Sequence, residues 1–112
     1  MGARANAAEN FVIRYFAELG YIGGSRRHIP GPGDQLFVHS SGQSSGDFAA
    51  VLLVETKKCN PRAIWQNFRR EDRAAMRALL LPPGSERLLV NVAGAGATAR
   101  VDQIWREDEW PT

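Results

Sequence analysis

The most constraining feature of this sequence is an uninterrupted apolar run that ends abruptly in charge. Residues 48–54 read Phe-Ala-Ala-Val-Leu-Leu-Val, and Glu-Thr-Lys-Lys follows directly at 55–58. A continuous apolar run of this length is typical of a strand that is covered on both faces of its sheet. Residues 48–57 are therefore predicted to form a β-strand with helices packed against its sheet, which indicates an α/β or α+β domain.

The remaining segments are separated by clear turn signals. Apolar residues at three- and four-residue spacing indicate a first helix, and Pro82-Pro83-Gly84 ends a second helical region. A basic segment rich in glycine and proline is predicted to form a loop at 23–33. The expected elements are a helix at 5–19, strands at 21–22, 34–39 and 48–57, one or two helices at 61–81, and strands at 88–92 and 99–105. This order, α-β-β-β-α-β-β, predicts an α/β domain with a mixed central β-sheet flanked by helices.

Length and composition limit the class of protein. The chain has 112 residues, which predicts one domain over 1–112, with an acidic and peripheral tail at 106–112. No apolar run approaches the roughly 18–20 residues that span a bilayer, and no apolar segment follows Arg4 as in a signal peptide. Cys59 is the single cysteine, which excludes an internal disulfide and a cysteine-based zinc site. These features favour a cytoplasmic protein without a membrane partner.

Acidic side chains and a lysine are placed to meet at the polar end of the strand at 48–57. Residues two apart in a strand point to the same face, so Glu55 and Lys57 are expected to project side by side. Asp34 opens the preceding strand, which is expected to pair with 48–57 as a hairpin. Two hard oxygen ligands at one point suit Mg²⁺ or Mn²⁺, and an ammonium group beside them suits a water or a phosphate. Glu9 borders the apolar face of the first helix and is a candidate third carboxylate.

Each of these residues also has a structural alternative. Glu9 and Asn6 have the spacing of a capping box at a helix start. Asp34 follows Pro-Gly, as turn aspartates do, and Lys57 would block aggregation if its strand lay at a sheet edge. The sequence leaves these alternatives open.

Lysine usage is an independent observation. Of the 14 basic residues 12 are arginine, and the two lysines are adjacent at the end of one strand. A compact ammonium group acts on a water or a phosphate oxygen as a point charge, which a guanidinium does less well. The net charge is only +2, but residues 1–81 carry 11 basic and 7 acidic residues, whereas 82–112 carry 3 and 5. The cationic excess therefore lies in the part of the chain that contains the candidate site.

This arrangement resembles the PD-(D/E)XK nuclease superfamily, and specifically the Holliday junction resolvases of archaeal and phage type. The shared pattern is a helix that carries Glu9, a Gly-Tyr end, a basic loop, Gly-Asp at 33–34 and Glu-x-Lys at 55–57. Phe-Arg-Arg-Glu at 68–71 is similar to the stretch that follows Glu-x-Lys in the resolvases, and the likeness extends over roughly residues 4–105.

The resemblance implies a restriction-endonuclease-like fold and a set of site residues. The implied catalytic residues are Glu9, Asp34, Glu55 and Lys57, and the implied metal ligands are Asp34, Glu55, the carbonyl oxygen of Thr56, and Glu9. Two positions depart from the family pattern, because Gly33 stands where proline is common and Asp72 where glutamine is frequent. Ser25 and Arg26 are similar to a serine and an arginine that assist catalysis from the family's basic loop.

The implied activity is metal-dependent hydrolysis of phosphodiester bonds in branched DNA, the four-way junction above all. Mg²⁺ is the expected cofactor, with Mn²⁺ able to substitute, and no small-molecule cofactor is expected. A homodimer in a bacterial or archaeal host cell is implied, with a phage-encoded origin left open. The predicted DNA contacts are Arg4, Ser25, Arg26, Arg27, Lys58, Arg62, Arg69 and Arg70.

Three alternatives to this interpretation remain. The chain is alternatively another nuclease of the superfamily, such as a nickase or a flap, restriction-like or RNA-processing enzyme. It is otherwise a non-catalytic nucleic-acid-binding protein whose carboxylates are structural. The arginines at 69, 70, 73 and 77 share one surface of the second helical region, and they alternatively form a solvated helix face rather than a DNA contact.

Overall fold

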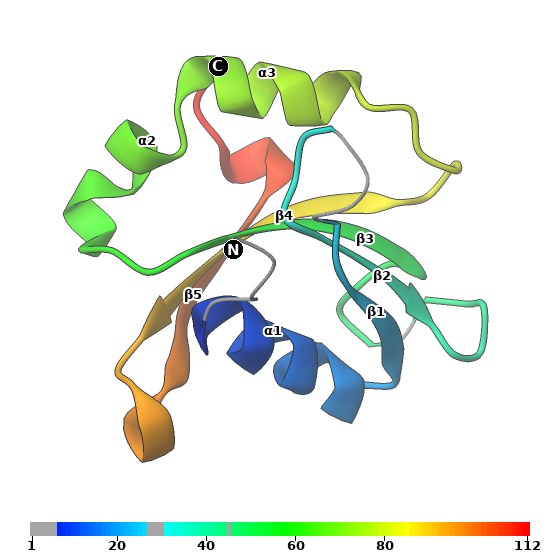
Figure 1. Ribbon diagram of the computed structural model, residues 1–112. Coiled ribbons are helices and arrows are strands. Elements are labelled where there is room, and N and C mark those ends of the chain that lie inside the picture. The colour runs from blue at the N-terminus through cyan, green and yellow to red at the C-terminus, as the bar shows by residue number, and fades with distance from the viewer. Residues whose placement is uncertain (1–6, 27–30, 45) are drawn as a thin grey trace.

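The protein is built on one five-stranded mixed sheet with helices on both of its faces (Figure 1). The computed structural model describes residues 7–26, 31–44 and 46–112. The strands lie in chain order across the sheet; β3 and β4 are parallel, and the other neighbours are antiparallel. The elements are α1 (Ala7–Glu18), β1 (Tyr21–Ser25), β2 (Gln35–His39), β3 (Val51–Lys57), η1 (Pro61–Ala63), α2 (Ile64–Asn67), α3 (Arg70–Ala78), β4 (Glu86–Ala93), η2 (Gly96–Thr98), β5 (Arg100–Arg106) and η3 (Glu107–Glu109).

The predicted α/β class, mixed sheet and element order are confirmed, with the second helical region divided in two. The division falls at Phe68 and Arg69, whose ψ angles of 86° and 166° are not helical. The side chain of Asp72 accepts a hydrogen bond from the backbone N–H of Arg69 at 3.1 Å and so caps the start of α3. No helix in the described ranges is long and apolar enough to cross a membrane.

Strand β1 extends further than the sequence predicted. A loop was expected from residue 23, but pairing with β2 continues through Ser25. Gly23 and Gly24 carry no side chains whose alternation could indicate a strand. A Cβ atom at Gly23 would lie 2.1 Å from the carbonyl oxygen of Leu36, so glycine is required for the two strands to approach.

Strand β3 is buried on both faces, as its apolar run predicted. Leu52 and Val54 belong to the core between the sheet and α1, whereas Leu53 belongs to the core beneath α2 and α3. All three side chains are fully buried. The two clusters also contain Val12 and Phe16 of α1 on one side, and Ile64, Phe68 and Met76 on the other. The prediction of two covered faces is confirmed. Because both faces of β3 are covered along its apolar run, the first polar residues, which follow Val54, come at the end of the strand.

The prediction that the acidic tail at 106–112 is peripheral is wrong. Trp110 is only 4% exposed, and its ring meets the ring of Phe68 edge to face at 4.9 Å. Its indole N–H donates to the carbonyl oxygen of Trp105 at 3.1 Å. The acidic composition of the tail predicted a solvated segment. One tryptophan nevertheless provides enough apolar surface to dock the tail beside α3 (Figure 1).

Two arginines of α3 hold this tail and do not belong to an exposed basic face. Arg73 is 6% exposed, and its Nε donates to the carbonyl oxygen of Pro111 at 3.0 Å. The guanidinium of Arg77 lies over the Trp110 ring, 5.4 Å from its centroid. The expectation that all four helix arginines share one open surface is therefore wrong, because two of them turn toward the tail.

Trp110→Phe is expected to lower the free energy of unfolding by about 1–2 kcal/mol, because the variant loses the indole hydrogen bond and part of the ring contact. Urea unfolding followed by circular dichroism measures this change. Leu80→Ala, at a side chain that is 94% exposed, is the control and should alter stability by less than about 0.5 kcal/mol. An unchanged stability of Trp110→Phe would contradict the docked tail.

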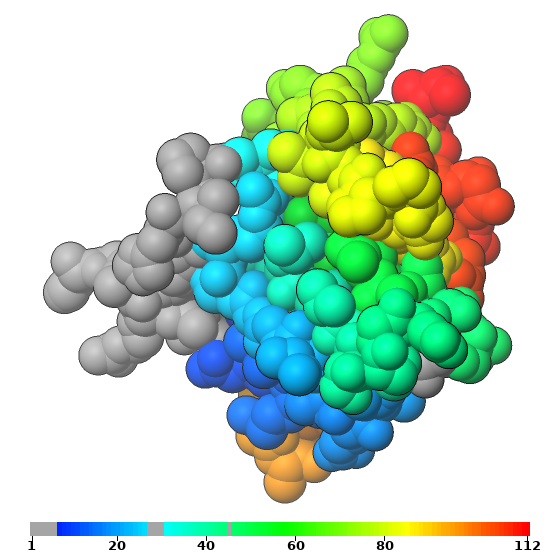
Figure 2. Space-filling model, turned by 90° about the vertical axis from the view of Figure 1, so that its right-hand side faces the viewer, coloured from blue at the N-terminus to red at the C-terminus, as the bar shows by residue number. Residues whose placement is uncertain are grey.

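The β1 edge of the sheet exposes apolar side chains. Figure 2 looks at this side of the molecule, with α1 (blue) below the strands and the connection from α3 to β4 (yellow) above them. Ile22 and Val38 lie opposite each other in the pairing of β1 with β2, and they are 68% and 44% exposed. This pair forms an apolar spot across the edge strand β1 and its neighbour β2.

Candidate active site

Glu55 and Lys57 lie side by side at the end of β3, as their spacing predicted. The Nζ atom of Lys57 is 3.3 Å from Oε2 of Glu55. Both side chains are largely shielded, with exposed fractions of 14% for Glu55 and 27% for Lys57. They project on the same face of the sheet as Leu53, the face that α3 covers.

Asp34 is brought to the same point from the neighbouring strand. Its backbone N–H donates to the carbonyl oxygen of Val54 at 2.9 Å, and its Oδ2 accepts a hydrogen bond from the backbone N–H of Thr56 at 3.0 Å. The predicted hairpin pairing of the two strands is confirmed. The carboxylate of Asp34 is thus anchored to the peptide that lies between Glu55 and Lys57.

Gly33 explains a departure from the resolvase pattern. Its φ angle is +86°, a conformation that L side chains rarely adopt. A Cβ atom at this position would lie 2.7 Å from Cδ1 of Leu53. Glycine before Asp34 therefore lets the chain turn tightly against β3 and aim the carboxylate at the strand end.

The two carboxylates are crowded with negative charge. The pKa of Glu55 is raised from 4.5 to about 7, chiefly by burial and then by the nearby charge of Asp34, while Lys57 opposes the shift. Burial also raises the pKa of Asp34, against the hydrogen bond from Thr56 and the charge of Lys57. One lysine therefore does not compensate two shielded carboxylates, and a bound cation would relieve their repulsion.

A third carboxylate approaches Glu55 from α3. Asp72 contributes to the raised pKa of Glu55 through its negative charge. It also lines a small pocket of about 180 Å³ with Glu55, Pro32, Gly33, Ala75 and Met76. The sequence marked Asp72 only as a departure from the resolvase pattern, since no local spacing shows that α3 returns over the strand end.

A buried glutamine that the sequence analysis missed connects the site to α1. Gln35 is fully buried, and its Nε2 donates to the carbonyl oxygen of Glu9 at 2.9 Å. Its Oε1 accepts a hydrogen bond from the hydroxyl of Thr56 at 2.5 Å. Gln35 thus connects the first helix with the residue between Glu55 and Lys57. A glutamine directly before Leu-Phe-Val was the only signal in the sequence.

Thr56→Val is expected to destabilise the fold by about 1–2 kcal/mol, because it leaves Oε1 of the buried Gln35 without a donor. Thr56→Ser keeps the hydroxyl and is the matched control, with a smaller loss expected. Thermal or urea unfolding of the two variants measures the difference. Equal stabilities of Thr56→Val and the wild type would contradict this link.

The segment after Lys57 is held by a second buried amide, Asn91, which is 1% exposed. Its Oδ1 accepts a hydrogen bond from the backbone N–H of Cys59 at 3.1 Å, and its Nδ2 donates to the carbonyl oxygen of Cys59 at 2.9 Å. This pair of bonds fixes the exit of the chain from β3. Burial raises the pKa of the Cys59 thiol, which agrees with a structural role for this residue.

Glu9 is close to the site through its backbone. Its side chain is half-buried, and its carbonyl oxygen is bound by Gln35. Among the described residues, no group of three or more His, Cys, Asp or Glu side chains is gathered closely enough to hold a metal ion. The structure therefore brings Asp34 and Glu55 together without Glu9, whose role as a third ligand stays a prediction. Its alternative partner in a helix cap, Asn6, lies outside the described residues.

The predicted DNA contacts lie in several places. Arg4 and Arg27 fall outside the described residues, and Ser25 ends β1. Arg26 is 9% exposed, and its guanidinium donates to the carbonyl oxygen of Pro32, so it braces the loop that leads to Asp34. The remaining four contacts are exposed around the polar end of β3 or on the helices that follow it: Lys58, Arg62, Arg69 and Arg70. All eight assignments stay predictions.

Comparisons with protein-family models, with curated proteins and with solved structures give no match to this chain.

Proposed function

We propose that this protein is a Mg²⁺-dependent, structure-selective DNA endonuclease that resolves four-way junctions by phosphodiester hydrolysis. The observation that carries the proposal is the cluster at the end of β3. Asp34 binds the backbone N–H of Thr56, and Lys57 lies 3.3 Å from Glu55, with both carboxyl pKa values raised by burial. Two carboxylates and one lysine on adjacent strands are what the PD-(D/E)XK resemblance implies for this site.

The sheet supports the restriction-endonuclease-like fold that we propose. Its five strands lie in chain order, and only β3 and β4 are parallel. The helices between these two strands lie on the face of the sheet that bears Glu55, and α1 lies on the other. This places the Glu-x-Lys motif at the carboxyl end of a central parallel strand, where sites of α/β proteins commonly form.

The donor set fits a divalent cation. Mg²⁺ prefers oxygen ligands, and it is commonly bound through one or two carboxylates, with waters and substrate phosphates completing its shell. Asp34 and Glu55 would hold it, with the carbonyl oxygen of Thr56 as a third protein ligand and Glu9 assisting. When bound, the cation would supply positive charge that stabilises a phosphate and lowers the pKa of a water.

Lys57 is proposed to orient or activate the attacking water. Its ammonium group is fixed beside Glu55, and the charge of Lys57 opposes the rise in the pKa of that carboxyl. Because Asp34, Thr56 and Gln35 are joined by hydrogen bonds, the carboxylates and the lysine are held on a rigid strand end. Such preorganisation positions catalytic groups for in-line attack on phosphorus.

Recognition of DNA is proposed to depend on backbone shape. Arg62, Arg69 and Arg70 are exposed on the segment that follows the Glu-x-Lys motif, where they are available to phosphates. A four-way junction has two symmetric strands to cut, so a homodimer with two sites would match it. The exposed pair Ile22 of edge strand β1 and Val38 of its neighbour β2 is a candidate contact for the second copy.

The test is a cleavage assay with purified protein, in Mg²⁺ and in EDTA. The substrates are a four-way junction, a linear duplex, a flap and a single strand of matched sequence. Paired symmetric nicks in the junction alone, and only with Mg²⁺, are the expected result. Cleavage of the flap or duplex instead would identify another nuclease of the superfamily. DNA binding without cleavage, unchanged in Asp34→Ala and without Mn²⁺ binding in calorimetry, would favour the non-catalytic alternative.

A further inference from the structure

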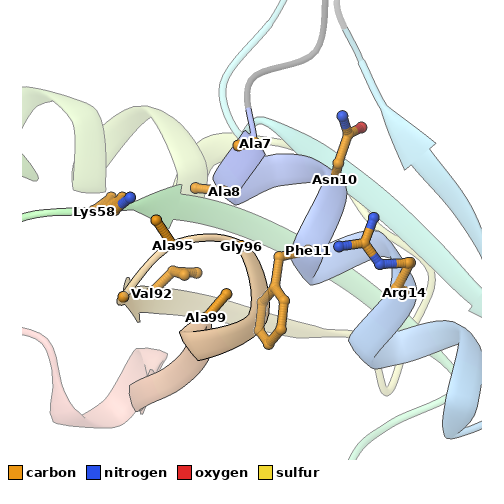
Figure 3. A pocket seen from close by; sticks show the side chains of 11 residues that line it. Ala7, Ala8, Asn10, Phe11, Arg14, Lys58, Val92, Ala95, Gly96 and Ala99 are labelled. Atoms are coloured by element: carbon orange, nitrogen blue, oxygen red, sulfur yellow. The ribbon is translucent and has the colours of Figure 1, made fainter.

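The two adjacent lysines face different surroundings. Lys57 lies beside Glu55, on the face of the sheet that α3 covers. Lys58, one residue on, lines a pocket formed with α1 and the turn between β4 and β5 (Figure 3). This pocket has a volume of about 190 Å³ and shares no lining residue with the pocket at Glu55. The function proposed above gives it no role.

The pocket combines positive charge with an apolar wall. Arg14 and Lys58 are its two charged residues, and no acidic residue lines it. Within the described part of the chain, neither side chain forms an ion pair or a hydrogen bond. Phe11 and Val92 provide the apolar wall, together with alanines of α1 and of the β4–β5 turn. An arginine and a lysine that have no partner among the described residues, beside an aromatic ring, form a site for a ligand that is both anionic and partly apolar.

We propose that this pocket binds one nucleotide of the nucleic-acid strand that the protein cleaves, an inference that rests on the proposed function. Arg14 and Lys58, on opposite sides of the pocket, would contact phosphates of the strand, and the sugar or base would lie against Phe11. The volume is below the roughly 300–1,000 Å³ of pockets for drug-sized ligands, which suits a single small unit. Because Lys58 follows Lys57 directly, the pocket and the carboxylates lie at the same end of β3.

The chain offers matched variants for a test that involves no catalysis. Ala95 lines the pocket, is exposed and has an extended backbone (φ −149°), so Ala95→Phe fills the pocket without altering charge. Ala97→Phe is its control, in the same turn and exposed but outside the pocket lining. Arg14→Gln removes one of the two charges. Its control is Arg100→Gln, at an exposed arginine that does not line the pocket.

The measurement is the anisotropy of a labelled single-stranded oligodeoxynucleotide, titrated with each variant in EDTA. Ala95→Phe and Arg14→Gln are expected to weaken binding about tenfold, and both controls are expected to stay within about twofold of the wild type. Wild-type affinity in Ala95→Phe and Arg14→Gln would overturn the proposal. Dissociation constants of dCMP measured by calorimetry form a second arm. If dCMP binds as tightly as the oligonucleotide, the pocket is a site for free nucleotides and the strand assignment is wrong.

The two proposals fail separately in these experiments. Loss of binding in the pocket variants, with no cleavage of any substrate by the wild type, would retain the nucleotide site and remove the nuclease. Cleavage by the wild type with unaffected binding in both pocket variants would do the reverse. Urea unfolding of all four variants verifies that each is folded.

Discussion

Lys57→Ala is expected to reduce the rate of junction cleavage by about 10²–10⁴-fold, the usual contribution of a positioned acid or base. The ammonium group of Lys57 is 3.3 Å from Glu55 and shielded from solvent, so its loss removes the positive charge that opposes the raised pKa of both carboxylates. Lys58→Ala provides the matched control, because Lys58 is the adjacent residue and lines the α1 pocket instead. Lys58→Ala should weaken DNA binding, while its kcat stays within a few-fold of that of the wild type.

Single-turnover cleavage at saturating enzyme separates these two effects, since it reports the chemical step without the binding step. Lys57→Arg tests whether charge alone suffices. A guanidinium is bulkier and cannot give up its proton, so only partial recovery of the rate is expected. Equal rates for Lys57→Ala and Lys58→Ala would contradict the assignment of Lys57 to the chemical step.

The candidate site was predictable as far as its signals are local in the sequence. The apolar run before Glu55 indicated a strand with two covered faces, and alternation then placed Glu55 and Lys57 together. The position of Asp34 followed from the hairpin expected between neighbouring strands. Each of these inferences needs only the period of a strand and the nearest turn.

The parts that were missed depend on contacts between distant residues. Gln35 binds the backbone of Glu9, 26 positions away, and Asn91 binds that of Cys59, 32 positions away. Trp110 packs on Phe68 although its own neighbours are acidic. A single polar residue in an apolar strand does not identify its partner, and a lone tryptophan has no periodicity. For the same reason the sequence grouped Arg73 with Arg70, whereas the structure separates a buried arginine from an exposed one.

Glu55→Gln is expected to abolish cleavage and yet to stabilise the metal-free protein at alkaline pH. Below pH 4.5, Glu55 holds its proton in both the folded and the unfolded chain. Between pH 4.5 and about 7 the unfolded chain releases the proton, whereas the folded chain keeps it because its pKa is raised. The wild type therefore loses stability as the pH rises through this window, by up to about 3 kcal/mol. Glutamine does not ionise, so the variant avoids this loss.

Urea unfolding at pH 5 and at pH 8 in EDTA measures this difference. At pH 8 the free energy of unfolding of Glu55→Gln should exceed that of the wild type by up to about 3 kcal/mol. At pH 5 this difference should be much smaller. Glu71→Gln, at an exposed carboxylate in the first turn of α3, is the control and should change stability by less than about 0.5 kcal/mol at either pH.

Mg²⁺ should stabilise the wild type at pH 8 and have little effect on Glu55→Gln, because a ligand that binds only the folded state stabilises it by mass action. A wild type as stable as Glu55→Gln at pH 8 in EDTA would show that Glu55 is not destabilised by its surroundings. A cation at this site would then have no electrostatic basis, even if junction cleavage were observed.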